Sequence, residues 1–321
     1  LAKSSISEAQ SYVTYTSSYE EANTSITMQV DPNNCSLDLI KIDSETKKPL
    51  SNVTFEITKE NGEKLGQYTT NEKGIIQLNN LKPGVIKIKE IKVDDRYILN
   101  GKVEQVLLQW GKISKIEIEN NRKKGNLKIV KIDSENKEIK LKGIEFELYN
   151  EKKELINKFI TDENGEAVLE NLNIGTYTIK EIKTKEEYVL NQEEIEIKIE
   201  WNKQTQLEIK NKKIKGQIKI TKISKDDNKI TGKKAGTPIA NVEFEIKNEK
   251  GEVVETIITN KQGMAITNKL EKGKYYIKET KTDENYELNN TTYEIEIAEN
   301  DQIANIQITN KSKNKLPRTG F

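Results

Sequence analysis

"LIKIDSETKKPLSNVTFEI" occupies residues 39–57, and two later stretches repeat its pattern. They are "IVKIDSENKEIKLKGIEFEL" at 129–148 and "ITKISKDDNKITGKKAGTPIANVEFEI" at 220–246, the second of which has a longer loop. Self-similarity at a regular spacing is the signature of tandem repeats, and the spacing of about 90 residues between the first two copies suits a small domain. The sequence therefore predicts three copies of one domain.

Short alternating runs rich in Ile, Val, Thr and Tyr fill each copy, and Asn-Gly, Lys-Gly and Pro-Gly pairs separate these runs. Such runs are typical of half-buried antiparallel strands joined by tight turns. The sequence thus predicts an all-β protein of three tandem β-sandwich domains, without a substantial helix. The predicted organisation is a segment at 1–35, interpreted as the end of a preceding domain plus a linker, then domains at 36–122, 123–213 and 214–311, and a tether at 312–321.

Composition argues against several classes of function. The 53 basic and 52 acidic residues are interspersed, so we expect no basic surface for nucleic acid. The chain has no histidine, and its single cysteine, Cys35, is interpreted as a linker residue. We therefore expect no catalytic turnover, no metal and no cofactor. No signal peptide and no apolar run of about 18 residues is visible, so the sequence is interpreted as a fragment that lacks its targeting end.

Three strands of each copy end their apolar face in a polar residue. Residues two apart on a strand share a face, so Lys41 follows Leu37 and Leu39 toward the core of the first copy. The full set is Lys41, Lys131 and Lys222 in the first strands, Glu90, Glu181 and Glu279 in the strands after the glycine turns, and Asn120, Asn211 and Asn310 in the last strands. A strand that turns polar where it leaves the core explains any one of these residues, but not the same trio in every copy. A buried hydrogen-bonded Lys–Glu pair capped by Asn remains a structural alternative.

A second hypothesis uses the chemistry of these groups. Burial lowers the pKa of a lysine and frees a nucleophilic amine, whereas burial raises the pKa of a glutamic acid. A protonated acid could then polarise the carbonyl of the Asn carboxamide while the amine displaces ammonia. The product would be a Lys–Asn isopeptide bond, and the folded core would supply proximity without an external enzyme.

This pattern resembles the Cna B-type, prealbumin-like repeats of Gram-positive surface proteins over residues 36–311. In those repeats the lysine lies in a K-x-D motif, the acid follows a Gly-Tyr strand start and the asparagine ends the last strand. "KID" at Lys41 and Lys131 fits, whereas "KIS" at Lys222 departs because position 224 is Ser; "GTYTIKE" and "GKYYIKE" fit, whereas "GVIKIKE" lacks the Tyr. The resemblance implies one isopeptide bond in each copy, between the first strand and a neighbouring last strand.

The C-terminal "LPRTG" resembles the L-P-x-T-G signal that sortases read. It consists of Leu316, Pro317, Arg318, Thr319 and Gly320. The resemblance implies that a sortase cysteine attacks the Thr319 carbonyl and cleaves the bond to Gly320. The new end would then pass to an amine on a peptidoglycan precursor or on a pilin.

These features together imply a secreted, extracellular protein anchored to the cell wall. Its domains would form a stalk that presents an N-terminal adhesive region, absent from this sequence, to a host extracellular-matrix or surface ligand. A minor pilin subunit at a pilus tip or base is one alternative, while the absence of a Tyr-Pro-Lys-Asn-like stretch argues against a shaft subunit. The non-catalytic stalk of a secreted enzyme is another.

Overall fold

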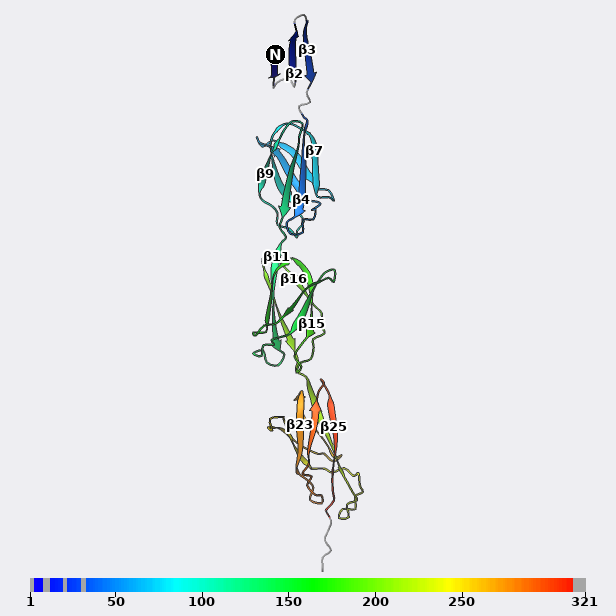
Figure 1. Cartoon of the computed structure of the whole chain (residues 1–321). Coiled ribbons are helices and arrows are strands. Elements are labelled where there is room, and N and C mark those ends of the chain that lie inside the picture. The colour runs from blue at the N-terminus through cyan, green and yellow to red at the C-terminus, as the bar shows by residue number, and fades with distance from the viewer. Residues whose placement is uncertain (1–2, 8–11, 20–21, 30–32, 314–321) are drawn as a thin grey trace, which may run out of the picture. The chain divides into compact units, whose positions relative to one another are not determined.

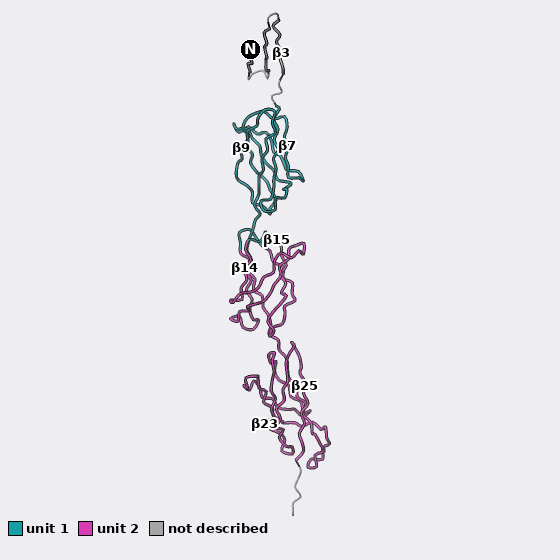
Figure 2. The backbone as a smooth tube through the Cα atoms, viewed as in Figure 1, with its two compact units in different colours: residues 1–126, 171–174, 199–203 teal, residues 127–170, 175–198, 204–321 magenta. Residues whose placement is uncertain are grey.

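The computed structural model describes residues 3–7, 12–19, 22–29 and 33–313 of the chain (Figure 1). Every regular element in these ranges is a β-strand, which confirms the predicted all-β class. Over the same ranges there is no helix of the length and apolarity that crossing a membrane requires. The chain forms two compact units, one of residues 1–126, 171–174 and 199–203, the other of residues 127–170, 175–198 and 204–321 (Figure 2).

The first unit begins with a small antiparallel sheet of order β1-β2-β3. A two-sheet sandwich follows, with strand orders β10-β4-β7 and β6-β5-β8-β9. The strands are β1 (Lys3–Ser7), β2 (Tyr12–Tyr19), β3 (Ala22–Gln29), β4 (Cys35–Asp43), β5 (Thr54–Lys59), β6 (Lys64–Thr69), β7 (Ile75–Leu81), β8 (Gly84–Lys92), β9 (Val103–Leu108) and β10 (Ile113–Asn120).

The core of this sandwich comes from the alternating side chains that the sequence pattern places inward. Leu37 and Leu39 of β4 pack with Phe55 of β5 and Ile88 of β8. Cys35, the first residue of β4, is fully buried in the same core. Its interpretation as a linker residue is therefore wrong, because its side chain continues the inward face of the strand.

The second and third domains repeat this arrangement, and most of their residues belong to the second unit. The second domain has sheets of order β14-β11-β17 and β13-β12-β15-β16; in the third, β18 pairs with β21, β22 and β25, opposite β20-β19-β23-β24. The strands are β11 (Lys124–Asp133), β12 (Glu145–Asn150), β13 (Leu155–Ile160), β14 (Glu166–Asn173), β15 (Gly175–Lys183), β16 (Ile195–Ile199), β17 (Gln204–Asn211), β18 (Lys215–Ser224), β19 (Glu243–Lys247), β20 (Val253–Ile258), β21 (Met264–Ile266), β22 (Leu270–Glu271), β23 (Gly273–Lys281), β24 (Thr292–Ile297) and β25 (Ile303–Asn310).

The first and last strands of a domain are neighbours in one sheet. β4 runs parallel to β10, and the register places Lys41 opposite Ile118. Asn120 lies two residues beyond Ile118, so its side chain points to the same face of the sheet as Lys41. The third domain repeats this register with Lys222 opposite Ile308. Sheet pairing alone thus directs the lysine and the asparagine into one interior.

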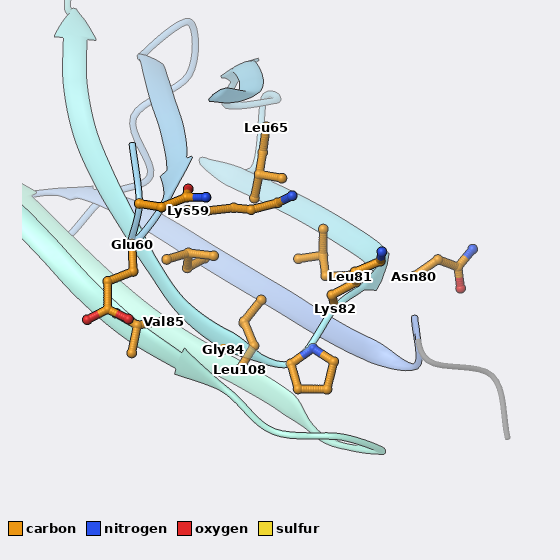
Figure 3. A pocket seen from close by; sticks show the side chains of 12 residues that line it. Lys59, Glu60, Leu65, Asn80, Leu81, Lys82, Gly84, Val85 and Leu108 are labelled. Atoms are coloured by element: carbon orange, nitrogen blue, oxygen red, sulfur yellow. The ribbon is translucent and has the colours of Figure 1, made fainter. Parts of the chain in front are cut away.

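The first domain has a cleft at the start of β8. Ile86 stands at the position held by Tyr177 and Tyr275 in the later copies. Tyr275 is buried in the core of the third domain, and its hydroxyl donates a hydrogen bond to the Glu271 carbonyl at 2.7 Å. In the first domain, Ile86, Leu65, Leu81 and Leu108 line a cleft of about 630 Å³ (Figure 3). The smaller side chain therefore leaves the position of the aromatic ring unfilled.

Replacing Ile86 by Tyr should fill part of this cleft and stabilise the first domain by about 1 kcal/mol, because cavity-filling changes typically add that much. Scanning calorimetry of the full chain should show the first-domain transition at a higher temperature. Ile88→Tyr is the matched control, since Ile88 lies two residues on and is 1% exposed. Overpacking there should cost about 1–3 kcal/mol. A lower transition temperature for Ile86→Tyr would show that the cleft does not accept the ring.

Candidate functional site

A lysine, a glutamate and an asparagine meet between the two sheets of the first domain. The Nζ of Lys41 donates a hydrogen bond to Oδ1 of Asn120 at 2.5 Å and lies 3.1 Å from Oε2 of Glu90. The Nδ2 of Asn120 donates to Oε1 of Glu90 at 2.7 Å. The three side chains thus close a triangle in which each contacts the other two.

The second and third domains build the same triangle. The Nζ of Lys131 lies 2.6 Å from both Asn211 Oδ1 and Glu181 Oε2, and Asn211 Nδ2 donates to Glu181 Oε1 at 2.5 Å. The structure therefore brings together the lysine, the glutamate and the asparagine that the alternating strand pattern predicted to face inward.

In the third domain, Lys222 Nζ lies 2.5 Å from Asn310 Oδ1 and 2.6 Å from Glu279 Oε2. Asn310 Nδ2 donates to Glu279 Oε1 at 2.6 Å. In every domain the carboxylate contacts the amide nitrogen, whereas the sequence-based hypothesis placed the acid at the amide carbonyl. The reason is that a lysine ammonium only donates hydrogen bonds and so takes Oδ1, which leaves the amide N–H groups for the carboxylate.

Backbone hydrogen bonds fix the lysine of the triangle on both sides. Lys41 N donates to the carbonyl of Gly74 at 2.8 Å, and Lys41 O accepts from Leu50 N at 2.9 Å. Gly74 has a φ of +70°, and a Cβ there would meet Lys41 O at 2.5 Å. Gly165 repeats this contact with Lys131, at 2.6 Å. A glycine is therefore required beside the lysine, which explains the Gly in "NEKG" and "DENG".

A phenylalanine closes one side of each triangle. Phe55 pairs with Glu90 across β5 and β8, and its ring centroid lies 6.0 Å from Lys41 Nζ. Phe146 and Phe244 occupy the equivalent positions, at 5.8 Å and 5.6 Å from their lysines. Sequence reasoning missed these rings, although the Phe-Glu pair that recurs in "VTFEI", "IEFEL" and "VEFEI" is a signal that could have found them.

All nine side chains of the triangles are buried, none with more than 4% of its surface exposed. Burial lowers the pKa of Lys41, Lys131 and Lys222, and in each domain the neighbouring glutamate opposes this effect. A lysine with a lowered pKa more readily gives up a proton to become a neutral amine. Among the described residues, no group of three or more His, Cys, Asp or Glu side chains could hold a metal ion.

A second buried network lies beside the triangle in the first domain. Asp43 accepts hydrogen bonds from the Tyr97 hydroxyl at 2.8 Å and from Arg122 Nε at 2.6 Å. Burial alone would raise the pKa of Asp43, but the Thr46 N–H, the Tyr97 hydroxyl and Arg122 together hold it well below its ordinary value. Asp133 and Tyr188 repeat the contact in the second domain at 2.9 Å.

The third domain lacks this network because Ser224 replaces the aspartate. Ser224 Oγ donates instead to the Asp226 carbonyl at 2.6 Å, and the buried Tyr286 hydroxyl has no hydrogen-bond partner in the described structure. The departure from "KID" therefore changes the neighbouring network and leaves the Lys222 triangle intact.

A family model described as the SpaA prealbumin-like fold domain matches residues 35–122, 125–213 and 216–312. The chain belongs to this SpaA family. Its fold is thus three tandem SpaA domains, as the resemblance to prealbumin-like repeats implied. The "LPRTG" stretch lies outside the described residues.

Similar proteins include pilins and surface proteins. The structure of the Bacillus anthracis TIE protein is 31% identical, has a TM-score of 0.69, and aligns with 97% of this chain and 58% of that chain. The trypsin-resistant surface T6 protein of Streptococcus pyogenes is 39% identical over 59 residues, which are 18% of this chain and 11% of that protein. BcpA, the major pilin subunit of Bacillus cereus, is 17% identical with a TM-score of 0.45, over 87% of this chain and 99% of that one. The chain of SpaA domains therefore spans little more than half of the first of these relatives and a small part of the second.

Proposed function

We propose that this chain belongs to an extracellular surface protein of a Gram-positive bacterium, in which the SpaA domains form a non-catalytic stalk. Each domain is locked by a Lys–Asn isopeptide bond, and a sortase attaches the chain to the cell wall through Thr319. The observation that carries the proposal is the Lys–Glu–Asn triangle, closed in all three domains. An adhesive region outside this sequence, which binds a host matrix or surface ligand, completes the proposal.

Two contacts of the glutamate support the isopeptide reaction. With the lysine neutral, the shared proton of the Lys–Glu pair resides on the carboxyl group, and the Nζ lone pair adds to Cγ of the asparagine. Nζ then gives a proton to one carboxyl oxygen while the other gives its proton to Nδ2. The Cγ–Nδ2 bond breaks, ammonia leaves, and the carboxylic acid is regenerated. The glutamate contacts both nitrogens, so it can move the proton between them.

The bond would stabilise the folded state by lowering the conformational entropy of the unfolded chain. Lys131 and Asn211 are 80 residues apart in sequence. By the entropy argument used for disulfides, a cross-link that closes such a loop stabilises the folded state by about 4.5 kcal/mol. Since the single cysteine offers no internal disulfide, this is a substantial covalent reinforcement for a small domain.

Intact mass spectrometry of the purified full chain tests the proposal. Each bond releases one ammonia, so the mass should lie about 51 Da below that calculated from the sequence, about 17 Da for each domain. Replacing one glutamate by glutamine should reduce the mass deficit by one ammonia, measured against the calculated mass of each variant. The variants are Glu90→Gln, Glu181→Gln and Glu279→Gln.

The matched control is Glu166→Gln, because Glu166 contacts Lys128 at 2.7 Å in a partly exposed ion pair of the second domain. This variant should keep the full deficit. A wild-type chain at its calculated mass would refute the cross-links, and the triangles would then be buried ion pairs.

A further inference from the structure

A hydroxyl group contacts the leaving nitrogen in two of the three domains. Asn211 Nδ2 donates to Thr184 Oγ1 at 2.8 Å, and Asn310 Nδ2 donates to Thr282 Oγ1 at 2.8 Å. A carboxamide nitrogen carries two N–H donors. In these domains one donor goes to the glutamate and the other to the threonine.

A β-bulge brings the threonine to this place. In the second domain Phe146 pairs with Glu181 but Glu145 pairs with Lys183, so one extra residue lies between them. A bulge of this kind re-aims the side chains that follow it. Thr184, three residues after the glutamate, therefore points to the same interior as Glu181. The first and third domains have the same bulge.

The first domain places Val93 at this position. Val93 packs against the apolar core and has no hydroxyl to offer Asn120. In this domain Lys41 Nζ also lies 3.1 Å from Glu90, against 2.6 Å for each of the other lysines. Its triangle is thus the least tightly closed.

We propose that Thr184 and Thr282 are positioning residues for the displacement of ammonia, and that the first domain, which has Val93 instead, forms its isopeptide bond most slowly. This inference rests on the proposed function. The threonine oxygen holds Nδ2 away from the lysine, so Cγ and Oδ1 face the amine. It also accepts an N–H from the nitrogen while that nitrogen becomes ammonia. The first domain must hold its carboxamide with one hydrogen bond fewer.

The rate of bond formation in each domain tests the inference. The full chain is made in a short cell-free translation pulse, quenched in acid after set times and digested. Mass spectrometry then measures the fraction of each lysine peptide joined to its asparagine peptide. One neutral hydrogen bond corresponds to about a fivefold change in rate. The first domain should therefore react about fivefold more slowly than the other two.

Isosteric exchanges separate positioning from packing. Val93→Thr should accelerate the first domain about fivefold, and Thr184→Val should slow the second by the same factor, while the unchanged domains of the same chain serve as controls. Thr184→Ser keeps the hydroxyl and should keep the rate. Equal rates in wild type and Thr184→Val would overturn the inference, and so would Thr184→Ser being as slow as Thr184→Val, because that result indicates packing. If no lysine peptide ever joins its asparagine peptide, the proposed function itself fails.

Discussion

Pulling the full chain by its two ends should release none of the sequence enclosed between the cross-linked residues of the SpaA domains. In the first domain, force enters through β4 and leaves through β10, and these strands are parallel neighbours. With the isopeptide bond in place, force passes from Lys41 directly to Asn120. These two residues are 79 apart in sequence, and the residues between them then bear no tension. Unfolding of the remaining sheet contacts cannot lengthen the chain.

Removing one bond should restore one large step. In Glu181→Gln, unfolding of the second domain should add about 280 Å of contour length, because 80 residues extend to about 3.5 Å each. Glu279→Gln should add about 310 Å, since its cross-linked residues are 88 apart. Optical tweezers or force microscopy can distinguish these steps.

Two further variants control the pulling experiment. Glu166→Gln, which removes a partly exposed ion pair, should behave as wild type. The double variant Lys131→Met with Glu181→Gln removes the nucleophile and leaves neither a buried ammonium nor a buried carboxylate unpaired, so it covers the case in which Glu181→Gln alone fails to fold. A wild-type chain that shows three steps of these sizes would contradict the cross-links.

The alternation of inward-facing and outward-facing residues along each strand was sufficient to predict which side chains form the triangle. Apolar residues at alternate positions of β4, β8 and β10 fix which side chains face inward, and Lys41, Glu90 and Asn120 continue those faces. Periodicity is a local property, so a single sequence carries it in full. The three internal copies then supplied what one copy could not, namely that the trio recurs.

Contacts that depend on irregular backbone were not predictable in the same way. Thr184 faces Asn211 only because a bulge follows Glu181, and nothing in "EIKTK" marks an extra residue. The orientation of the Asn211 carboxamide depends on donors and acceptors that meet across two sheets. Neither feature has a period that sequence analysis could detect.

The structure also shows which contacts the departure from the lysine motif affects. From sequence, the Ser at 224 made the third copy the departure from the lysine motif, yet Ser224 belongs to the neighbouring Asp–Tyr network of the other domains. The substitution that reaches the triangle is Val93, in a copy whose "KID" fits the motif. A motif residue near the lysine in sequence can therefore belong to a different hydrogen-bond network from the lysine itself.

The C-terminal signal should make the chain a substrate for sortase. A sortase that reads L-P-x-T-G, supplied with the full chain and triglycine, should convert the chain to a product that ends at Thr319 and carries triglycine in amide linkage. The bond between Thr319 and Gly320 breaks, Gly320-Phe321 leaves as a dipeptide, and the triglycine amine forms the new bond. Mass spectrometry of the product measures the exchange.

In the third domain, the last described contacts of the chain involve residues that precede the signal in sequence. Lys313 N donates to the Asn285 carbonyl at 3.0 Å, and Ser312 N donates to Asp226 at 2.9 Å, so the domain holds the chain as far as these residues. The signal begins after them, at Leu316. Thr319→Ala should abolish the exchange, whereas Arg318→Ala should preserve it, since the x position of the motif accepts different residues. A wild-type chain that stays unchanged would remove cell-wall attachment from the proposal. The isopeptide bonds would stand, because they depend on the buried triangles alone.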